Sequence, residues 1–376
     1  MKTFIISRGI PSKDYPLYGI FEYDQAKALA KNGIDTSMLV IDFRSLAYKR
    51  KYGFLSYEKD NVKIFELSLP LGMYRRALPL LQRLLYLLYK KTIKIVGRPD
   101  VVHAHFYSIA AIASFIKKKD NVPFIVTEHS SKLNKAAAHI SNIDKSLTMK
   151  AYSQADAIIS VSKTLSSNIK DNFGFESHII HNMIDLEHSN YSKKNDNESF
   201  TFISVGNLIS RKGFDILIKA FKKAFADDSK VCLNIIGEGE ERIHLQNIIN
   251  ECNISDRVRL LGQKTRTELF ELMRKGDAFV LASKIETFGV VYIEAMVCGL
   301  PVIATRCGGP EDFVNDTNGI LIPTDDIEAL SKALIDMRLN IDNFDSKKIS
   351  EECYNKFSSE NIAEQIVEQY YKVVEK

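Results

Sequence analysis

Short apolar runs alternate along the whole chain with longer segments in which apolar residues recur every three or four positions. The short runs predict strands and the longer segments, such as 20–31 and 107–118, predict helices. The strands predicted in the first half are 3–7, 36–41, 62–67, 100–105, 124–127, 157–161 and 178–180. Those predicted in the second half are 202–205, 231–236, 258–261, 278–281, 302–304 and 320–322. Strand–helix–strand order repeated in this way predicts parallel sheets flanked by helices.

The alternation is interrupted once, at residues 189–198, which contain no apolar aliphatic residue. This stretch is the predicted linker between two domains, 1–188 and 199–358. Each is expected to be a doubly wound, Rossmann-like α/β domain, and the two are expected to face each other across a cleft that binds ligands beyond the carboxyl ends of the strands. Residues 359–376 are amphipathic and predict a final helix, which we expect to cross back to the first domain.

Composition excludes several classes of protein. The 376 residues are 45% apolar and 10% aromatic, which rules out a largely disordered chain. No stretch is long and apolar enough for a membrane-spanning helix, and the apolar run at the start is too short for a signal peptide. The five cysteines are scattered and never form a CxxC pair, which indicates thiols in a reducing cytoplasm. We therefore expect a cytoplasmic protein.

The charge is unevenly distributed. Residues 1–190 carry 27 Lys and Arg against 17 Asp and Glu, a balance of +10, and the remainder carries 24 against 30, a balance of −6. A basic half suits an anionic partner, either nucleic acid or anionic lipid.

Residues 72–98 concentrate this positive charge, with seven basic residues and no acid among leucines and tyrosines. A helix here could lie in the headgroup plane of an anionic membrane at the inner face of the cell, inserting Leu80, Leu84, Leu87 and Leu88. It could equally pack on the core and expose a basic face. Nucleic acid is not expected, because no recognised binding fold accompanies the charge.

Two glycine-rich turns follow predicted strands of the second half and lead into predicted helices. The first runs from Gly206 to Gly213 and includes Arg211 and Lys212, and the second, 283–289, contains Glu286. Backbone N–H groups and the helix dipole favour an anion at such turns. A solvated basic turn is the alternative for the first, which lacks the spacing of a Walker loop. Residues 307–312 form a third glycine turn that is expected to enter a helix.

Glu286 and Glu294, with seven residues between them, can accept hydrogen bonds from the vicinal hydroxyls of a ribose or sugar. Their setting, ETFGVVYIEAMVCGLPVIAT, closely resembles the retaining glycosyltransferases of family 4, which have the GT-B fold. The resemblance extends over nearly the whole chain. It includes Gly206 in the phosphate loop and Gly237 at the next strand end.

The resemblance implies a role for each matching residue of the second half. Lys212 would hold the diphosphate of a nucleotide sugar, Glu294 the ribose, and Glu286 would lie near the transferred sugar. Backbone N–H groups of Phe288, Gly289 and Val290 would contact phosphate or sugar. The family often has arginine where this chain has Asn207. Either Arg211 supplies the missing cation, or the diphosphate site has one cation fewer than in the family.

In the first half, the resemblance places the family's glycine loop at Gly19 and a histidine that contacts the donor sugar at His129. His103 and His105 are expected to point to opposite faces of one strand and to be structural. Asp325 and Asp326 precede a predicted helix, so we interpret them as capping residues. We expect no metal and no other cofactor, since GT-B enzymes generally need none.

The expected function is transfer of a sugar, with retention, from a nucleotide diphosphate sugar to an acceptor held by the first domain. Similarity to capsule and exopolysaccharide enzymes favours a lipid-linked intermediate of bacterial surface polysaccharide as that acceptor. The alternatives are another GT-B enzyme, such as a nucleotide-sugar epimerase or a phosphorylase, and a non-catalytic module that binds sugar nucleotides.

Overall fold

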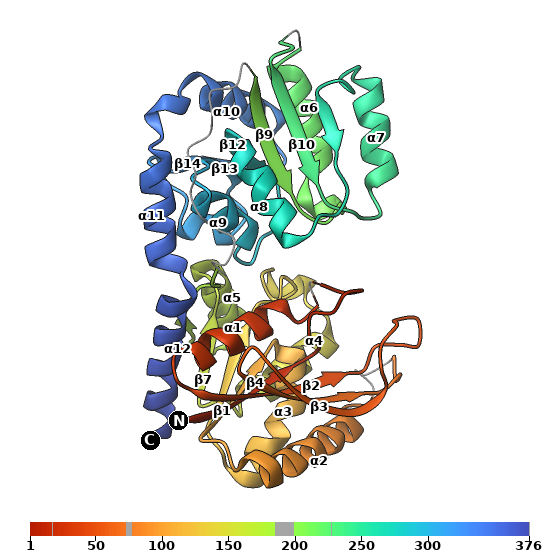
Figure 1. Cartoon of the computed structure of the whole chain (residues 1–376), viewed down its shortest axis with the longest axis vertical. Coiled ribbons are helices and arrows are strands. Elements are labelled where there is room, and N and C mark those ends of the chain that lie inside the picture. The colour runs from red at the N-terminus through yellow and green to blue at the C-terminus, as the bar shows by residue number, and fades with distance from the viewer. Residues whose placement is uncertain (17, 73–76, 185–198, 227, 376) are drawn as a thin grey trace. The chain divides into compact units, whose positions relative to one another are not determined.

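A computed structural model describes the chain except for residues 17, 73–76, 185–198, 227 and 376, so the predicted linker 189–198 lies outside the described residues. The chain divides into two compact units. Unit 1 comprises Met1–Met183 and Ser359–Lys376, and unit 2 comprises Ile184–Ser358 (Figure 1). Both are α/β units built on a mainly parallel sheet, the predicted fold class.

The described residues of unit 1 form an eight-stranded sheet in the order β3-β4-β2-β1-β5-β6-β7-β8. Its strands are β1 (Lys2–Ser7), β2 (Asp35–Asp42), β3 (Gly53–Lys59), β4 (Val62–Ser68), β5 (Val101–His105), β6 (Phe124–Glu128), β7 (Ala157–Ser160) and β8 (His178–Ile179). All pairs are parallel except that β3 runs antiparallel to β4. The central strands are buried almost throughout because helices cover both faces of the sheet.

Strand β3 is an addition to the predicted strands. It lies at the edge of the sheet, and its residues are half-buried or exposed, so it lacks the continuous apolar run of the inner strands. Asp60 and Asn61 join it to β4 with φ values of 53° and 59°. Two consecutive positive φ values are typical of a tight hairpin turn.

Helices cover unit 1 on both sides (Figure 1). They are α1 (Ile20–Lys31), α2 (Leu78–Val96), α3 (Tyr107–Asp120), α4 (Asn142–Tyr152), α5 (Lys163–Phe173), α12 (Ser359–Val374) and the 3₁₀ turn η2 (Ala137–His139). Successive side chains of β1 reach opposite layers: Ile5 joins the core beneath α1 and α12, while Phe4 packs edge-on against Tyr89 of α2.

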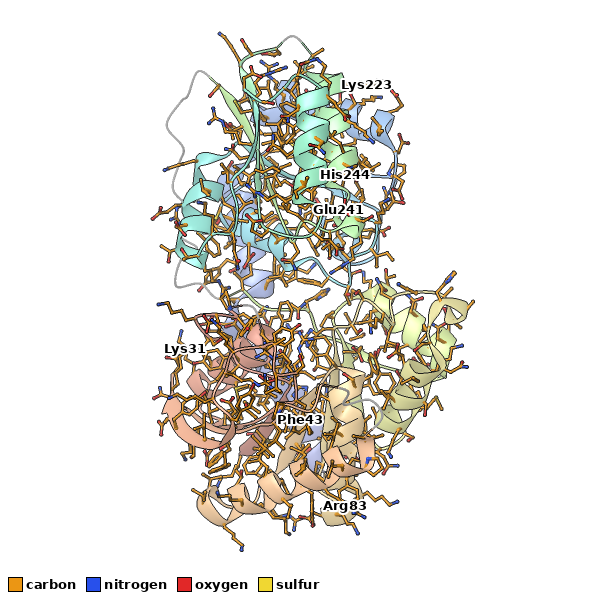
Figure 2. The ribbon with its side chains drawn as sticks, turned by 90° about the vertical axis from the view of Figure 1, so that its right-hand side faces the viewer. Lys31, Phe43, Arg83, Lys223, Glu241 and His244 are labelled. Atoms are coloured by element: carbon orange, nitrogen blue, oxygen red, sulfur yellow. The ribbon has the colours of Figure 1, made fainter. Side chains whose placement is uncertain are left out.

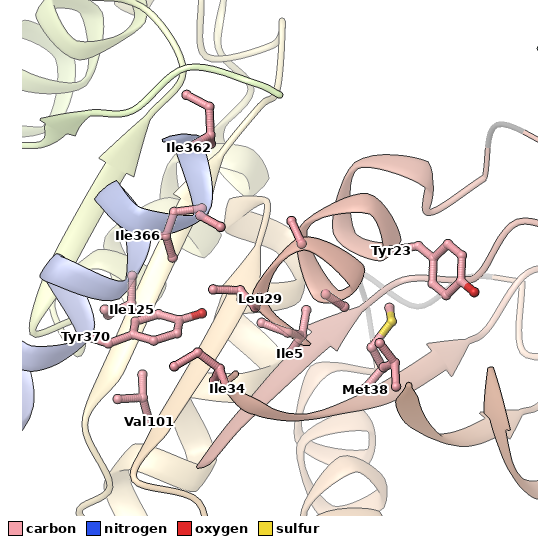
Figure 3. Close-up of a cluster of buried hydrophobic side chains, with 14 of the residues drawn as sticks. Ile5, Tyr23, Leu29, Ile34, Met38, Val101, Ile125, Ile362, Ile366 and Tyr370 are labelled. Carbon is pink, nitrogen blue, oxygen red and sulfur yellow. The ribbon is translucent and has the colours of Figure 1, made fainter. Parts of the chain in front are cut away.

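Helix α12 completes one core of unit 1 (Figure 3). Its residues Ile362, Ile366 and Tyr370 are buried in the same cluster as Leu29 of α1 and Ile5 of β1. The last helix of the chain therefore forms part of the interior of unit 1.

The described residues of unit 2 form a six-stranded, fully parallel sheet in the order β11-β10-β9-β12-β13-β14. Its strands are β9 (Phe200–Val205), β10 (Val231–Ile236), β11 (Val258–Leu260), β12 (Ala278–Leu281), β13 (Val302–Thr305) and β14 (Gly319–Ile322). Its helices are α6 (Phe214–Ala224), α7 (Arg242–Glu251), α8 (Arg266–Lys275), α9 (Val290–Val297), α10 (Ile327–Leu339) and α11 (Ser346–Phe357), with 3₁₀ turns η4 (Ser210–Lys212), η5 (Gly309–Asp312) and η6 (Ile341–Asn343).

Local chemistry sets several helix starts in unit 2. Thr265 and Glu268 form a reciprocal capping box at α8, and Asp326 caps α10 by accepting from the Ala329 N–H at 2.9 Å. The capping interpretation is thus confirmed for Asp326. The third glycine turn, however, enters the four-residue 3₁₀ turn η5 rather than an α-helix, because Asn315 follows the turn closely and begins a hydrogen-bonded loop with Asn318.

None of the helices in the described part of the chain combines the length and the apolar character that crossing a membrane would require.

Candidate active site

The strand order of unit 2 reverses next to β9, which has β10 on one side and β12 on the other. Open α/β sheets bind ligands at such a reversal, beyond the carboxyl ends of the strands. The loops that follow β9 and β12 are the two glycine turns that contain Lys212 and Glu286. The fold therefore brings these predicted site residues together, 74 positions apart in the sequence.

Lys212 and Glu286 form an ion pair, with 2.5 Å between Lys212 Nζ and Glu286 Oε1. Their side chains are only 12% and 8% exposed. The Ser283 hydroxyl donates to the same carboxylate oxygen at 2.7 Å, and the Thr305 hydroxyl donates to the Ser283 carbonyl. Partial burial weakens solvent screening and so strengthens the attraction between the two charges. The ion pair therefore holds Lys212 in position at the edge of the sheet.

The third glycine turn holds the backbone of Glu286. The Glu286 N–H donates to the Cys307 carbonyl at 3.1 Å, and the Gly309 N–H donates to the Glu286 carbonyl at 3.0 Å. An added Cβ at Gly309 would lie 2.2 Å from the Phe288 Cα, so only glycine permits this approach.

Two glycines of the site meet between β9 and β10. Gly237 has φ 147°, and a Cβ there would lie 1.9 Å from the Gly206 carbonyl oxygen. The Gly206 N–H donates to the Ile236 carbonyl at 3.0 Å. Gly237 is therefore required for the close packing of these two strand ends.

Helix α9 begins at Val290, directly after Gly289, whose φ of 91° is left-handed. Phe288 is buried and its ring contacts Phe313 and Phe357, which anchors the loop before the helix. The Tyr292 N–H donates to the Gly289 carbonyl at 3.0 Å, and the N–H groups at the start of a helix carry partial positive charge. An anion can bind at this helix start, next to Lys212.

Glu294 lies inside α9, with its side chain 14% exposed and 3.7 Å from an Arg266 amino group. Arg211 differs from its neighbour Lys212 because it is exposed. The two predicted cations of unit 2 thus differ: Lys212 is ion-paired at the sheet edge, and Arg211 beside it is exposed to solvent.

The sheet of unit 1 carries the other predicted residues. Gly19 precedes α1 with φ 76°, and a Cβ there would lie 2.1 Å from the Gly9 carbonyl oxygen. The loop after β1 therefore folds back on itself at two glycines.

His129 follows β6, and the adjacent Glu128 fixes its loop. Glu128 accepts from the N–H groups of His129 and Ser130 with one oxygen, and from the Tyr107 N–H and the Tyr152 hydroxyl with the other. Burial raises the pKa of Glu128 to about 7, although these four donors favour the carboxylate.

The expectation that His103 and His105 point to opposite faces is wrong. Their rings stack with centroids 4.8 Å apart, because residues two positions apart on a strand share a face. His105 in turn stacks on His129 at 5.2 Å, and its Nδ1 shares a 3.0 Å hydrogen bond with His129 Nε2. His103 is a buried structural residue as expected, but His105 contacts the candidate site residue directly.

The column of histidines is uncharged. Burial lowers the pKa of His103 and of His129 to about 3 each, and that of His105 also falls well below its usual value. His103 Nδ1 faces the Tyr370 hydroxyl at 2.8 Å and the Gln25 amide nitrogen at 3.1 Å, so it accepts. A pocket beside His129 is lined by Phe21 of α1 and Ile362 of α12, among others.

Among the residues that the structure describes, no group of three or more His, Cys, Asp or Glu side chains could hold a metal ion. Asp325 pairs with Lys284 at 2.8 Å and Asp326 caps α10. The expectation of a metal-free site stays a prediction.

Sequence reasoning missed the residues that support the site. Ser283 precedes Glu286 by three positions at the end of β12, and Glu128 precedes His129 at the end of β6. A polar residue at or just beyond the carboxyl end of a buried strand of a parallel sheet is a signal that could have identified both.

Comparisons with known proteins agree with this architecture. Residues 187–351 match the family model described as glycosyl transferases group 1, and residues 21–188 match glycosyltransferase family 4. An uncharacterized glycosyltransferase of Methanocaldococcus jannaschii is 30% identical over 280 residues, which cover 73% of this chain and 75% of that protein. The chain belongs to the GT-B glycosyltransferases of the family 4 type.

Two solved structures of the same fold align along nearly the full length of this glycosyltransferase. Sucrose-phosphate synthase from Thermosynechococcus elongatus has a TM-score of 0.83 at 20% identity, covering 99% of this chain and 98% of that one. Anabaena HepE, in complex with UDP and glucose, has a TM-score of 0.75 at 20% identity, covering 99% of this chain and 100% of its own. The enzyme is thus a transferase with two Rossmann-like units.

Proposed function

We propose that this enzyme transfers a sugar, with retention of configuration, from a nucleotide diphosphate sugar to an acceptor that is a lipid-linked intermediate of bacterial surface polysaccharide. The observation that carries the proposal is the Lys212–Glu286 ion pair at the strand reversal of unit 2, beside the start of α9. A cation beside a helix start, where the first N–H groups carry partial positive charge, suits a diphosphate.

Each predicted residue has a defined part in the proposed reaction. Lys212 and the N–H groups at Phe288, Gly289 and Val290 stabilise the charge that grows on the leaving diphosphate. Glu294 holds the ribose, and Glu286 and His129 lie against the transferred sugar. Arg211, being exposed, stays available as a second cation for the diphosphate.

The reaction breaks the bond between the anomeric carbon and the diphosphate oxygen. The acceptor hydroxyl forms the new bond on the same face of the sugar, and its proton passes to the leaving diphosphate. No protein nucleophile is required, so the enzyme contributes positioning and charge stabilisation.

The test is release of nucleoside diphosphate from a panel of nucleotide sugars, beginning with UDP-glucose because the HepE complex contains UDP and glucose. We expect slow release without acceptor, retained in EDTA because Lys212 and helix N–H groups meet the diphosphate charge. Lys212→Ala should lower it by about 10²–10³-fold, and Lys219→Ala, an exposed lysine of α6, should not. A wild-type enzyme that releases nothing from any donor would contradict the proposal, and loss in EDTA restored only by Mg²⁺ or Mn²⁺ would contradict a metal-free site.

The proposed lipid-linked acceptor requires an approach to the membrane, and the outer face of α2 supports one. Leu80 and Leu87 are 50% and 65% exposed, and Arg83 and Lys94 are exposed on the same side. In Figure 2, Arg83 lies at the surface of unit 1, in contrast to the buried Phe43. We propose that this face contacts anionic headgroups at the inner face of the cell membrane.

The inner face of α2 shows that the expected insertion of Leu88 into lipid is wrong. Leu88 is buried at 4% exposure and Leu84 is half-buried, so Leu88 cannot insert into lipid. Lys90 is ion-paired with Asp120, and Lys91 lies over the Phe54 ring. The core-packing interpretation is confirmed for the inner face of α2, and the exposed leucines and cations of the outer face support the proposed membrane contact. Residues 73–76, with two of the seven basic residues, lie outside the described part.

A further inference from the structure

The sheet of unit 1 has its own reversal of strand order, between β1 and β5. Strand β1 has β2 on one side and β5 on the other. Arg8 is the first residue after β1, and Phe106 is the first after β5. The position that favours ligands in this sheet is therefore occupied by an arginine and an aromatic ring.

Arg8 is held in place by rings rather than by hydrogen bonds. Its guanidinium carbon lies 4.1 Å from the centroid of the Phe106 ring and 5.6 Å from that of Tyr18. Its Nε is 3.6 Å from a Glu22 carboxylate oxygen, and its side chain is 37% exposed. Among the described residues, none forms a hydrogen bond with this guanidinium, whereas Arg44 bonds both oxygens of Asp42.

The partner of Arg8 is equally unusual. Glu22 is fully buried, and neither of its carboxylate oxygens makes a hydrogen bond of good geometry to the residues that the structure describes, although the backbone N–H groups of Arg8 and Glu22 and the Ser7 hydroxyl lie close enough to lower its pKa. Burying a charge without hydrogen bonds is costly and is found chiefly where a protein needs the charge. Burial raises the pKa of Glu22, and the charge of Arg8 opposes this rise.

Backbone strain marks the same place. Phe106 has φ 64° although it is not a glycine, and such strain persists mainly at functional sites. Its ring also lies 5.1 Å from the His129 ring. Arg8, Phe106 and His129 thus follow three neighbouring strands, β1, β5 and β6, at one edge of the sheet.

We propose that Arg8 binds a phosphate group of a substrate at this edge, in a position set by Phe106 and Glu22. A guanidinium is a rigid fork of donors that matches phosphate oxygens, and here its donors are not used by the protein. Glu22 orients the arginine but also weakens the local positive field. The inference rests on the proposed function, in which the phosphate belongs either to the donor diphosphate or to the lipid-linked acceptor.

Calorimetric titration with inorganic pyrophosphate tests the site directly. The full-length chain with Lys212→Ala serves as the parent, so that the diphosphate site of unit 2 does not dominate. Adding Arg8→Gln should weaken binding about 10- to 100-fold, and Arg8→Lys should weaken it less. Adding Glu22→Gln should tighten binding roughly three- to tenfold, because it removes a nearby negative charge and keeps the side-chain size.

Lys13→Gln is the matched control, since Lys13 is an exposed lysine of the same loop. It should leave pyrophosphate binding unchanged. Thermal unfolding of each variant checks the fold, and Arg8→Lys replaces Arg8→Gln if the glutamine variant does not fold.

Kinetics with otherwise wild-type enzyme identify the source of the phosphate. If Arg8→Gln increases the KM for the donor in acceptor-free hydrolysis, Arg8 binds a phosphate of the donor. If it increases only the KM for the acceptor, Arg8 binds a phosphate of the acceptor. The proposal is overturned if Arg8→Gln binds pyrophosphate within twofold of its parent, or if Lys13→Gln weakens binding as much. An enzyme that turns over no nucleotide sugar would contradict the proposed function, while the titration would still decide whether Arg8 binds phosphate.

Discussion

At the scale of single residues, the site of unit 2 depends on one carboxylate that serves two partners. Glu286 accepts from both Lys212 and Ser283 while the backbone of η5 holds its main chain. A ligand phosphate that binds Lys212 must compete with this carboxylate. The ion pair therefore fixes the lysine before the donor arrives, which lowers the reorganisation needed during the reaction.

The two glutamates should separate kinetically. Glu286→Gln keeps the size of the side chain but loses the charge beside the transferred sugar, so kcat should fall at least about 100-fold with a smaller change in donor KM. Glu294→Ala removes the proposed ribose contact and should raise donor KM about tenfold with kcat nearly unchanged. Steady-state kinetics measure both, with the exposed Glu251→Gln as control. Wild-type constants in both variants would show that neither residue touches the substrate.

The buried histidines should make unit 1 sensitive to acid. The folded pKa values of His103 and His129, about 3, lie below the usual 6.5, so the stability that they contribute is complete above pH 6.5. It is lost as the pH falls toward 3, at up to about 1.4 kcal/mol per pH unit for each histidine. Glu128, with its pKa raised to about 7, has the opposite effect: the stability that it contributes increases as the pH falls from about 7 to 4.5.

NMR titration and urea unfolding at several pH values measure this effect. The imidazole signals of His103 and His129 should keep their neutral positions down to about pH 4. His129→Asn should reduce the slope of unfolding free energy against pH below 4.5, where Glu128 no longer compensates. Titration of either imidazole near pH 6.5 would contradict the uncharged column.

At the scale of elements, α2 shows how one helix can serve two environments. Its buried side fills the core of unit 1 with residues such as Leu85 and Tyr89, and its outer side exposes Leu87. The apolar residues of the outer side are thus available to a partner without loss of core packing.

Charge on the outer side of α2 should control vesicle binding. Each cation near an anionic surface contributes about 1 kcal/mol, so Arg83→Gln with Lys94→Gln should reduce partitioning roughly 30-fold at low salt. The matched control is Lys347→Gln with Lys348→Gln, two exposed lysines of α11. Sedimentation with anionic vesicles measures both, and donor hydrolysis in solution should be unchanged. If the wild-type enzyme does not bind vesicles at low salt, the outer face of α2 is a solvated surface only.

The inner strands and their following helices could be predicted from sequence because burial on both faces makes most of the strand residues apolar. Helix α1 is found over the same residues as predicted, 20–31, and β10 over 231–236. The edge strand β3 escaped prediction because its half-buried and exposed residues form no continuous apolar run.

The candidate site was predictable only in part for a related reason. Glu286 and Lys212 lie in recognisable motifs, but Glu22 and His105 acquire their importance from neighbours far apart in sequence. Contacts between strand ends depend on strand order. A strand order such as β2-β1-β5 cannot be predicted from the local periodicity of apolar residues.

At the scale of the whole molecule, the two units differ in how the chain builds them. Unit 2 is continuous, from Ile184 to Ser358, whereas unit 1 requires α12 from beyond unit 2. The two units should therefore respond separately to substitutions in their cores.

Ile366→Ala should destabilise unit 1 by about 2–5 kcal/mol, because Ile366 is buried between α12, α1 and the sheet. Val374→Ala, at a position 40% exposed, should change stability by less than about 0.5 kcal/mol. Differential scanning calorimetry should show a lower transition for unit 1 and an unchanged transition for unit 2 in the Ile366 variant. An equal shift of both transitions would show that the units unfold as one.

The place of α12 also sets an order of events during protein synthesis. Ribosomes complete unit 2 before they add Tyr370, whose hydroxyl bonds His103 beneath the column that ends at His129. Until then, Leu29 and the other apolar residues that α12 covers remain exposed, and a nascent chain presents them to chaperones. We therefore expect the enzyme to act on its substrate only after its last helix has been translated, and a chain that stops early should leave this core uncovered.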